Sequence, residues 1–157
     1  MIDSVQKMYG NILRIRACGI CFENDQLLLV NHQGLTNGDF WAPPGGGMQF
    51  GEVATDCVVR EFLEETGLVV EVRDFMFACE FMKEPLHAIE LFFLVKKVGG
   101  QLCKGIDPES GSNQIIKEVK FMDWKEIEGL KKENLHGIFG LTEKMDKIIG
   151  LKGYFKL

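Results

Sequence analysis

The chain has 157 residues, of which 46% are hydrophobic, so it can bury one core but is short for two independent domains. We therefore expect a single domain over residues 1–157. A net charge of −5 argues against general electrostatic attraction to nucleic acid, which clustered Lys and Arg would provide. No apolar run approaches the roughly 18 residues of a membrane span, and the N-terminus has no signal-peptide pattern, so we expect a cytoplasmic protein without a membrane partner.

The N-terminal residues predict two neighbouring strands. Residues 1–9 are compatible with a short helix or a loose tail, whereas residues 12–22 alternate between two kinds of side chain, as a strand does. Asn24-Asp25 marks a hairpin turn, and the apolar residues 26–31 form the second strand. A polar loop at residues 33–39 follows this hairpin.

A glycine-rich segment and a helix come next. The glycines are Gly45, Gly46, Gly47 and Gly51. Glycine permits positive φ and a close approach of the backbone to a ligand or metal, so we expect a loop here. Thr55 or Asp56 offers the side-chain oxygen that starts a helix, and Gly67 supplies the stop, which predicts about three turns of helix.

One face of this helix concentrates negative charge. At about 100° per residue, Glu61, Glu64 and Glu65 fall within roughly 100° of arc, so three carboxylates project into one small volume. They repel each other unless a cation intervenes, and hard cations such as Mg²⁺ prefer carboxylate oxygens. The opposite arc is apolar, with Val58, Val59, Phe62 and Leu63. An ordinary solvated face of an amphipathic helix is therefore the alternative interpretation.

The second half of the chain predicts further strands and one helix. Residues 68–81 form a strand pair or one long bent strand, and the strongly apolar residues 88–97 form a central strand. A polar loop at residues 104–113 separates these from a strand at 115–124. Apolar residues at helical spacing predict a last helix over about 141–149. This order alone indicates an α+β or α/β protein.

The five cysteines do not form a disulfide framework, because their number is odd and they are scattered along the chain. They are Cys18, Cys21, Cys57, Cys79 and Cys103. Cys18 and Cys21 form a CxxC pair inside an apolar strand pattern, without a second ligand pair at suitable spacing. Core packing is therefore favoured over zinc binding or redox chemistry.

Nine residues at fixed spacing set the acidic helix apart from an ordinary amphipathic one. They are Gly46, Glu52, Arg60, Glu61, Phe62, Glu64, Glu65, Gly67 and Leu68. This pattern resembles the signature box of the Nudix hydrolase family, which cleaves nucleoside diphosphates linked to another moiety X. Phe62 departs from the usual Ile, Leu or Val, a change that should affect packing more than chemistry. Trp41 and Pro44 resemble the usual lead-in, and residues 12–130 resemble the family in strand pattern only.

The resemblance implies an α/β fold, the Nudix-type α/β/α sandwich with a mixed β-sheet between helices. It also implies Mg²⁺-dependent hydrolysis of a pyrophosphate bond, with Mn²⁺ as an alternative cation. Glu61, Glu64 and Glu65 would hold the metal, and the carbonyl of Gly45 or Gly46 could complete its shell. Whether Glu61 is a ligand or the general base stays open.

Other residues of the box and beyond it are expected to support the metal. Arg60 would orient carboxylates through charge-assisted hydrogen bonds, and Glu52 would serve as a further ligand or hold one in place. Members of the family often draw one more acidic residue from across the sheet, for which Glu118 and Glu109 are the candidates here. We count Arg60 with the catalytic residues and Glu118 with the metal ligands.

The substrate is expected to be a small nucleotide, namely a nucleoside triphosphate, a sugar nucleotide or ADP-ribose. Arg14 and Arg16 share one face of the first strand and suit phosphate binding, and His32 follows on the second. The candidates for stacking on a base are Trp41, Phe50 and Phe81. The glycine segment, including Gly45 and Gly47, would bring its backbone close to the substrate.

Two features bear on the identity of X, and other functions stay open. Pro85 is near, but not at, the position of a proline typical of ADP-ribose enzymes, and the absence of a tyrosine between Tyr9 and Tyr154 argues against dinucleoside polyphosphates. A nucleotide-sensing module without turnover, or an isomerase of allylic diphosphates, would use the same fold. A homodimer is left open by the sheet edges and the apolar C-terminal segment.

Overall fold

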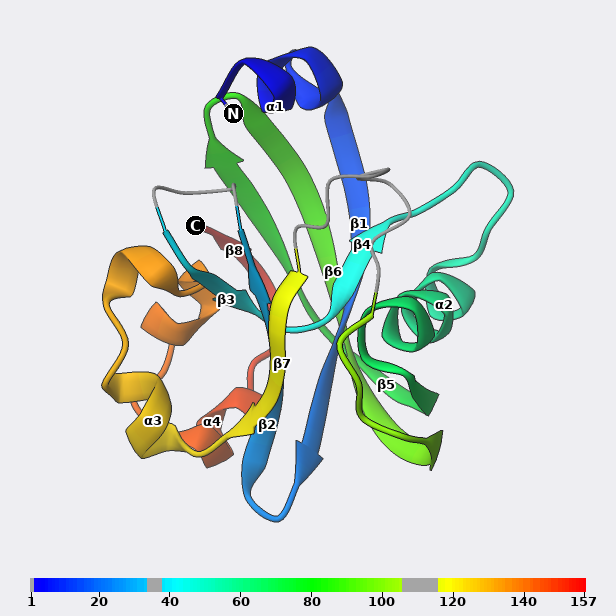
Figure 1. Ribbon diagram of the computed structural model, residues 1–157, viewed down its shortest axis with the longest axis vertical. Coiled ribbons are helices and arrows are strands. Elements are labelled where there is room, and N and C mark those ends of the chain that lie inside the picture. The colour runs from blue at the N-terminus through cyan, green and yellow to red at the C-terminus, as the bar shows by residue number, and fades with distance from the viewer. Residues whose placement is uncertain (1, 34–37, 106–115) are drawn as a thin grey trace.

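The computed structural model describes residues 2–33, 38–105 and 116–157. A mixed β-sheet forms the centre, with one helix over one face and the short C-terminal helices over the other (Figure 1). This arrangement confirms the expected α/β fold with a sheet between helices. Among the described residues, none of the helices is long and apolar enough to cross a membrane.

The sheet joins strands from both halves of the chain. The strands are β1 Leu13–Glu23, β2 Gln26–His32, β3 Phe40–Ala42, β4 Gly45–Gly47, β5 Leu68–Lys83, β6 Leu86–Gly100, β7 Ile116–Met122 and β8 Gly153–Lys156. The described strands follow the order β3-β2-β1-β6-β5-β8, while β4 pairs with β1 and β7 pairs with β2. Two pairs, β1 with β6 and β5 with β8, are parallel, and the others are antiparallel.

The predicted hairpin and the long fifth strand are confirmed. Asn24 and Asp25 have φ values of 52° and 60°, as a two-residue hairpin turn of the primed type requires. Residues 68–83 form one strand, whose pairing with β6 shifts register three times. The strand β6 lies between β1 and β5, so its predicted central place is correct.

The helices differ from expectation in their ends. They are α1 Ile2–Tyr9, α2 Ala54–Thr66, α3 Trp124–Glu128 and α4 Met145–Ile149, with 3₁₀ turns η2 Lys132–Asn134 and η3 Gly137–Gly140. The helix α2 begins after Val53, so the predicted start at Thr55 or Asp56 was wrong. Gly67 ends it with a φ of 72°, as predicted. The last helix, predicted over about 141–149, is shorter than expected, because α4 begins only at Met145.

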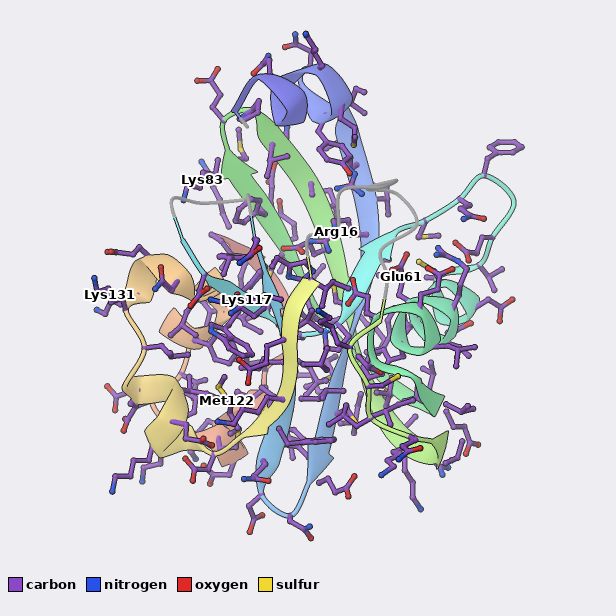
Figure 2. The ribbon with its side chains drawn as sticks, in the orientation of Figure 1. Arg16, Glu61, Lys83, Lys117, Met122 and Lys131 are labelled. Atoms are coloured by element: carbon purple, nitrogen blue, oxygen red, sulfur yellow. The ribbon has the colours of Figure 1, made fainter. Side chains whose placement is uncertain are left out.

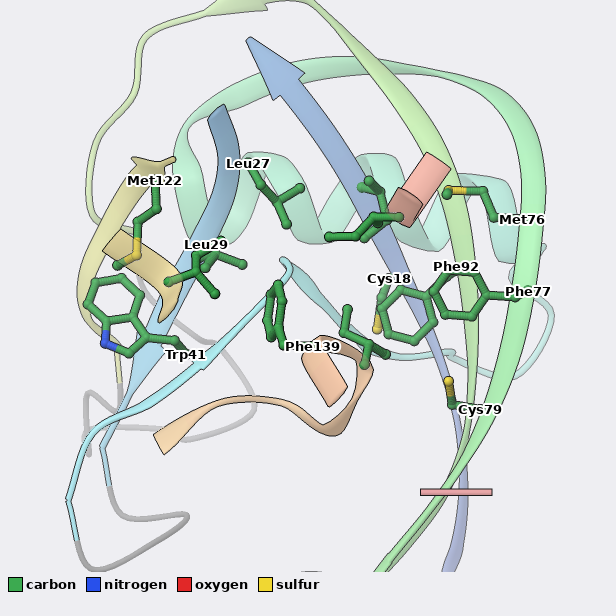
Figure 3. Close-up of a cluster of buried hydrophobic side chains, with 14 residues drawn as sticks. Cys18, Leu27, Leu29, Trp41, Met76, Phe77, Cys79, Phe92, Met122 and Phe139 are labelled. Carbon is green, nitrogen blue, oxygen red and sulfur yellow. The ribbon is translucent and has the colours of Figure 1, made fainter. Parts of the chain in front are cut away.

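Two hydrophobic clusters fill the two sides of the sheet. The larger one packs the C-terminal turns against the sheet through Ile127, Ile138 and Ile148, and Figure 3 shows its centre around Phe77 and Phe92. The smaller one includes Val58 and Phe62, which attach α2 to the other face. Burial of apolar surface on both faces is what holds the layers together.

The cysteines contribute to these cores. All five lie in the described ranges and are free thiols, and four of them are buried. Cys18 belongs to the larger cluster and Cys21 to the smaller one. The two thiols therefore point to opposite faces of the sheet, so this CxxC pair cannot coordinate one metal ion. The prediction of core packing is confirmed.

Candidate active site

The glycine segment forms a strand rather than the loop that we expected. Gly45–Gly47 is extended and pairs antiparallel with β1, and only Gly51 of the four predicted glycines has a positive φ, at 85°. Their small size is nevertheless required. A Cβ on Gly46 would lie 2.3 Å from the carboxyl carbon of Glu61, and one on Gly45 would lie 2.5 Å from the carbonyl oxygen of Ala17. Gly45 and Gly46 are therefore required because neighbouring atoms lie too close for a Cβ, and not because of a positive φ.

Two of the three clustered carboxylates are buried between α2 and β4. Glu61 is 4% exposed and Glu65 is 3% exposed, whereas Leu63 on the supposed core side is 54% exposed. The interpretation of a solvated acidic face is therefore wrong for these two residues. The backbone N–H of Gly45 donates to Oε2 of Glu65 at 3.3 Å, so the glycine strand supports one of them directly.

Arg60 holds several of the carboxylates in place. Its Nε donates to Oε1 of Glu52 at 2.7 Å, and its Nη1 donates to Oε1 of Glu61 at 2.7 Å and to Oε2 of Glu64 at 3.1 Å. Its Nη2 donates to the carbonyl oxygen of Gly47 at 3.2 Å. One guanidinium thus connects the segment before α2 and the C-terminal half of α2 with the glycine strand. Such charge-assisted hydrogen bonds are about twice as strong as neutral ones.

The pKa values of these groups reflect that connection. The hydrogen bond to Glu52, followed by the charges of its other partners, raises the pKa of Arg60. The same hydrogen bond lowers the pKa of Glu52 to about 2. Glu61 differs, because burial and then the negative charge of Glu65 raise its pKa to about 8 against the opposing effect of Arg60. The site therefore holds more negative charge than Arg60 can balance.

The donor set fits a hard divalent cation. Glu61, Glu64 and Glu65 offer carboxylate oxygens beside the carbonyl groups of the glycine strand, which are the ligands that Mg²⁺ prefers. Among the described residues, no three His, Cys, Asp or Glu side chains already form a preorganised metal cluster. We conclude that the oxygen donors of these residues are of the kind that a divalent cation binds.

Arg16 lies on the other side of the same glycine strand. Its Nη2 donates to the carbonyl oxygen of Gly45 at 3.0 Å, and its Nη1 donates to Oε2 of Glu90 at 2.8 Å. Figure 2 labels Arg16 and Glu61 near the centre of the molecule. Burial lowers the pKa of Arg16, but the surrounding negative charges, with Glu90 ahead of Glu65 and Glu61, outweigh it and raise the pKa. The structure thus brings Arg16 to the edge of the carboxylate site.

Two further predicted residues stand on the strands β1 and β2. Arg14 shares the strand face of Arg16, and its guanidinium stacks on the ring of Tyr9 at 4.3 Å. His32 is buried, and its Nε2 lies 3.7 Å from Oε1 of Glu65. Its Nδ1 has no hydrogen-bond partner among the described residues.

Other predicted residues lie apart from the carboxylates. Trp41 is buried in the larger hydrophobic cluster, and Phe50 is fully exposed on the segment before α2. Glu118 is exposed on β7 opposite Asn31, where it lines an open groove of about 330 Å³. Its role as a metal ligand stays a prediction, and Glu109 lies outside the described residues.

Sequence reasoning missed Glu90 and His136. Glu90 is 1% exposed and His136 is 3% exposed, and Nε2 of His136 lies 2.7 Å from Oε1 of Glu90. Burial raises the pKa of Glu90, but its interactions with His136 and the charge of Arg16 outweigh this effect and lower the value to about 2. A single carboxylate within the apolar run of β6 was the available signal for Glu90. His136 stands in a polar segment that gives no such signal.

Known proteins share the sequence pattern. The NUDIX domain family matches residues 13–142. An ADP-ribose pyrophosphatase from Methanocaldococcus jannaschii is 30% identical over 107 residues, which are 67% of this chain and 59% of that protein. The chain therefore spans less than two thirds of the length of this relative.

Solved structures share the fold. The crystal structure of a UDP-X diphosphatase has a TM-score of 0.68 at 20% identity, covering 98% of this chain and 73% of its own. A NUDIX hydrolase from Nitrosomonas europaea has a TM-score of 0.68 at 17% identity, covering 92% of this chain and 78% of its own. At such identities the likeness concerns the fold alone.

Proposed function

Because this chain belongs to the Nudix hydrolase family, we propose that it hydrolyses a pyrophosphate bond in a nucleoside diphosphate linked to a second moiety, in a reaction that requires Mg²⁺. The observation that carries this proposal is the pair of buried carboxylates, Glu61 and Glu65, packed against a glycine strand. Folding stability does not explain why both carboxylates are buried, since burial of like charges lowers stability.

The box residues would hold and orient the cation. Glu61, Glu64 and Glu65, with the carbonyl group of Gly46, are its proposed ligands, and Mn²⁺ would fit the same oxygen donors. When bound, Mg²⁺ supplies neutralisation of the diphosphate oxygens and activation of the attacking water. Arg60 fixes the rotamers of Glu61 and Glu64 through its hydrogen bonds.

The residues around the box would hold the substrate. Arg16 offers a guanidinium beside Gly45, where it can bind a diphosphate oxygen. Arg14 extends the positive charge along the same strand face, and the backbone of Gly45 and Gly47 allows a close approach. Trp41 would then act through the packing beneath the site, since it is buried.

ADP-ribose or a sugar nucleotide is the substrate class that we propose first. The 30% identical relative is named an ADP-ribose pyrophosphatase, and one structural neighbour is named a UDP-X diphosphatase. Both names describe a nucleoside diphosphate joined to a second group. Nucleoside triphosphates are the next class to test.

Turnover of a substrate panel tests the proposal. Nucleoside monophosphate release would be measured from ADP-ribose, a UDP-sugar, a nucleoside triphosphate and a dinucleoside polyphosphate, with Mg²⁺ and with chelator. We expect Mg²⁺-dependent release from ADP-ribose or the UDP-sugar and a loss of at least about 100-fold in kcat in Glu65→Gln. Tight nucleotide binding without turnover would instead support a sensing module, and unchanged turnover in Glu65→Gln would overturn the metal site.

A further inference from the structure

A chain of buried polar contacts runs from the C-terminal turns to the glycine strand. The backbone N–H of Ile138 donates to Nδ1 of His136 at 3.2 Å, and Nε2 of His136 lies 2.7 Å from Oε1 of Glu90. Arg16 then donates to Oε2 of Glu90 at 2.8 Å and to the carbonyl oxygen of Gly45 at 3.0 Å. We call Arg16, Glu90 and His136 the buried triad.

The hydrogen bond from the N–H of Ile138 fixes which nitrogen of His136 donates and which one accepts. Because Nδ1 of His136 accepts a hydrogen bond from the backbone N–H of Ile138, the ring carries its own proton on Nε2, which donates to Glu90. Glu90 accepts on both oxygens, one from His136 and one from Arg16. Each member therefore has a single arrangement that satisfies its neighbours.

Stability alone does not explain this triad. Glu90 is 1% exposed and His136 is 3% exposed, and removing a charged pair from water costs about as much as the pair returns. Apolar side chains of similar volume would fill the same space at equal or greater stability. The benefit of the triad must therefore be something other than stability, and we look for it in the member that reaches the surface.

Arg16 is that end. Its side chain is 24% exposed, whereas its anchor Glu90 is 1% exposed. Its Nε is buried and has no hydrogen-bond partner among the described residues. Its hydrogen bonds go to Glu90 and to the carbonyl oxygen of Gly45. The N–H of Gly45 in turn donates to Glu65, so Gly45 links the guanidinium to a proposed metal ligand. A guanidinium held on two edges has one orientation in which to meet an incoming anion.

We propose that Glu90 and His136 are positioning residues, which fix the guanidinium of Arg16 across Gly45 so that it binds an oxygen of the substrate diphosphate. This rests on the proposed function, because it takes the carboxylate site as the place of hydrolysis. The contact of Arg16 with Gly45 also ties the triad to the strand that supports Glu65. Neither Glu90 nor His136 touches the substrate.

The test compares substrate affinity with turnover. Variants Glu90→Gln, His136→Gln and Arg16→Lys would be assayed on the panel substrate that the wild type cleaves, and calorimetry would give their Kd for inorganic pyrophosphate with Mg²⁺. We expect Glu90→Gln and Arg16→Lys each to raise KM and the pyrophosphate Kd about tenfold or more, with kcat within about threefold. Their double variant should be no weaker than the weaker single one, since both act through one guanidinium.

The control is Glu80→Gln, which changes a carboxylate on β5 that contacts His87 at 2.9 Å and lies outside the triad. It should leave KM and Kd unchanged. Multiplicative effects of Arg16→Lys and Glu90→Gln, or a Tm loss in Glu90→Gln and His136→Gln without any change in KM and Kd, would overturn the proposal. Should Glu90→Gln fail to fold, His136→Gln and its double variant with Arg16→Lys decide the same question.

The two proposals can fail separately. A wild type that cleaves nothing but binds pyrophosphate, with the binding weakened in the triad variants, would refute the hydrolase and keep the triad. A wild type that cleaves its substrate, with triad variants unchanged in KM and Kd, would keep the hydrolase and refute the triad.

Discussion

Gly46→Ala should damage the site at one defined atom. The added Cβ would lie 2.3 Å from the carboxyl carbon of Glu61, so the carboxylate must withdraw by about 1 Å to reach ordinary van der Waals contact. Glu61 is buried and held by Arg60 at 2.7 Å, so it has no neighbouring position with the same hydrogen bond. A displacement of this size at a reacting centre costs about 100-fold.

The assay separates this effect from loss of folding. We expect kcat/KM to fall about 100-fold in Gly46→Ala, while the lost hydrogen bond costs only about 1–3 kcal/mol of unfolding free energy. Gly51→Ala is the matched control, because a Cβ there meets open space but the φ of 85° is strained. It should lose about 1 kcal/mol of stability and keep its kcat/KM.

One result would refute the reasoning. If Gly46→Ala kept kcat/KM within about threefold of wild type at saturating Mg²⁺, the close approach of this glycine would not position Glu61. Metal affinity, measured by titration of Mg²⁺ into both variants, gives the second readout. It should weaken in Gly46→Ala and stay constant in Gly51→Ala.

Two more predictions concern the balance of charge at the site. Arg60→Met removes the partner of Glu52, Glu61 and Glu64, so in chelator the free energy of unfolding should drop by about 1–3 kcal/mol. Mg²⁺ should restore part of this in a thermal melt, and an equal Tm loss with and without Mg²⁺ would contradict the shared role of the carboxylates. The pKa of Glu61 gives the second: between about pH 4.5 and 8 the folded protein keeps a proton that the unfolded chain has lost. Metal-free stability should therefore fall as pH rises through this window, by up to about 1.4 kcal/mol per pH unit. Glu61→Gln should remove this slope, and denaturant melts in chelator that retain it in the variant would assign it to another group.

The carboxylate cluster was predictable because it is local. Glu61, Glu64 and Glu65 lie within two turns of one helix, so their common face follows from helix geometry alone. Their burial did not follow, because it depends on β4 crossing the helix at Gly46. An acidic stripe on an exposed helix would give the same pattern of residues.

The features that sequence reasoning missed depend on distant pairing. The glycine segment is extended because it pairs with β1, about thirty residues earlier in the chain. The contact of His136 with Glu90 spans 46 residues and crosses from the C-terminal turns to the central strand. The strand β8 is four residues long and begins with a glycine, so it has too few residues to show alternation. Each of these required the fold to be known first.

The guanidinium of Arg60 has a consequence for how the protein acquires its ion. This guanidinium already balances part of the negative charge of Glu61 and Glu64, so a cation at the site adds to an attraction that the chain supplies itself. The free energy of ion uptake is therefore smaller than it would be for carboxylates without a cationic neighbour. The same carboxylates keep a partner within the fold when the ion leaves.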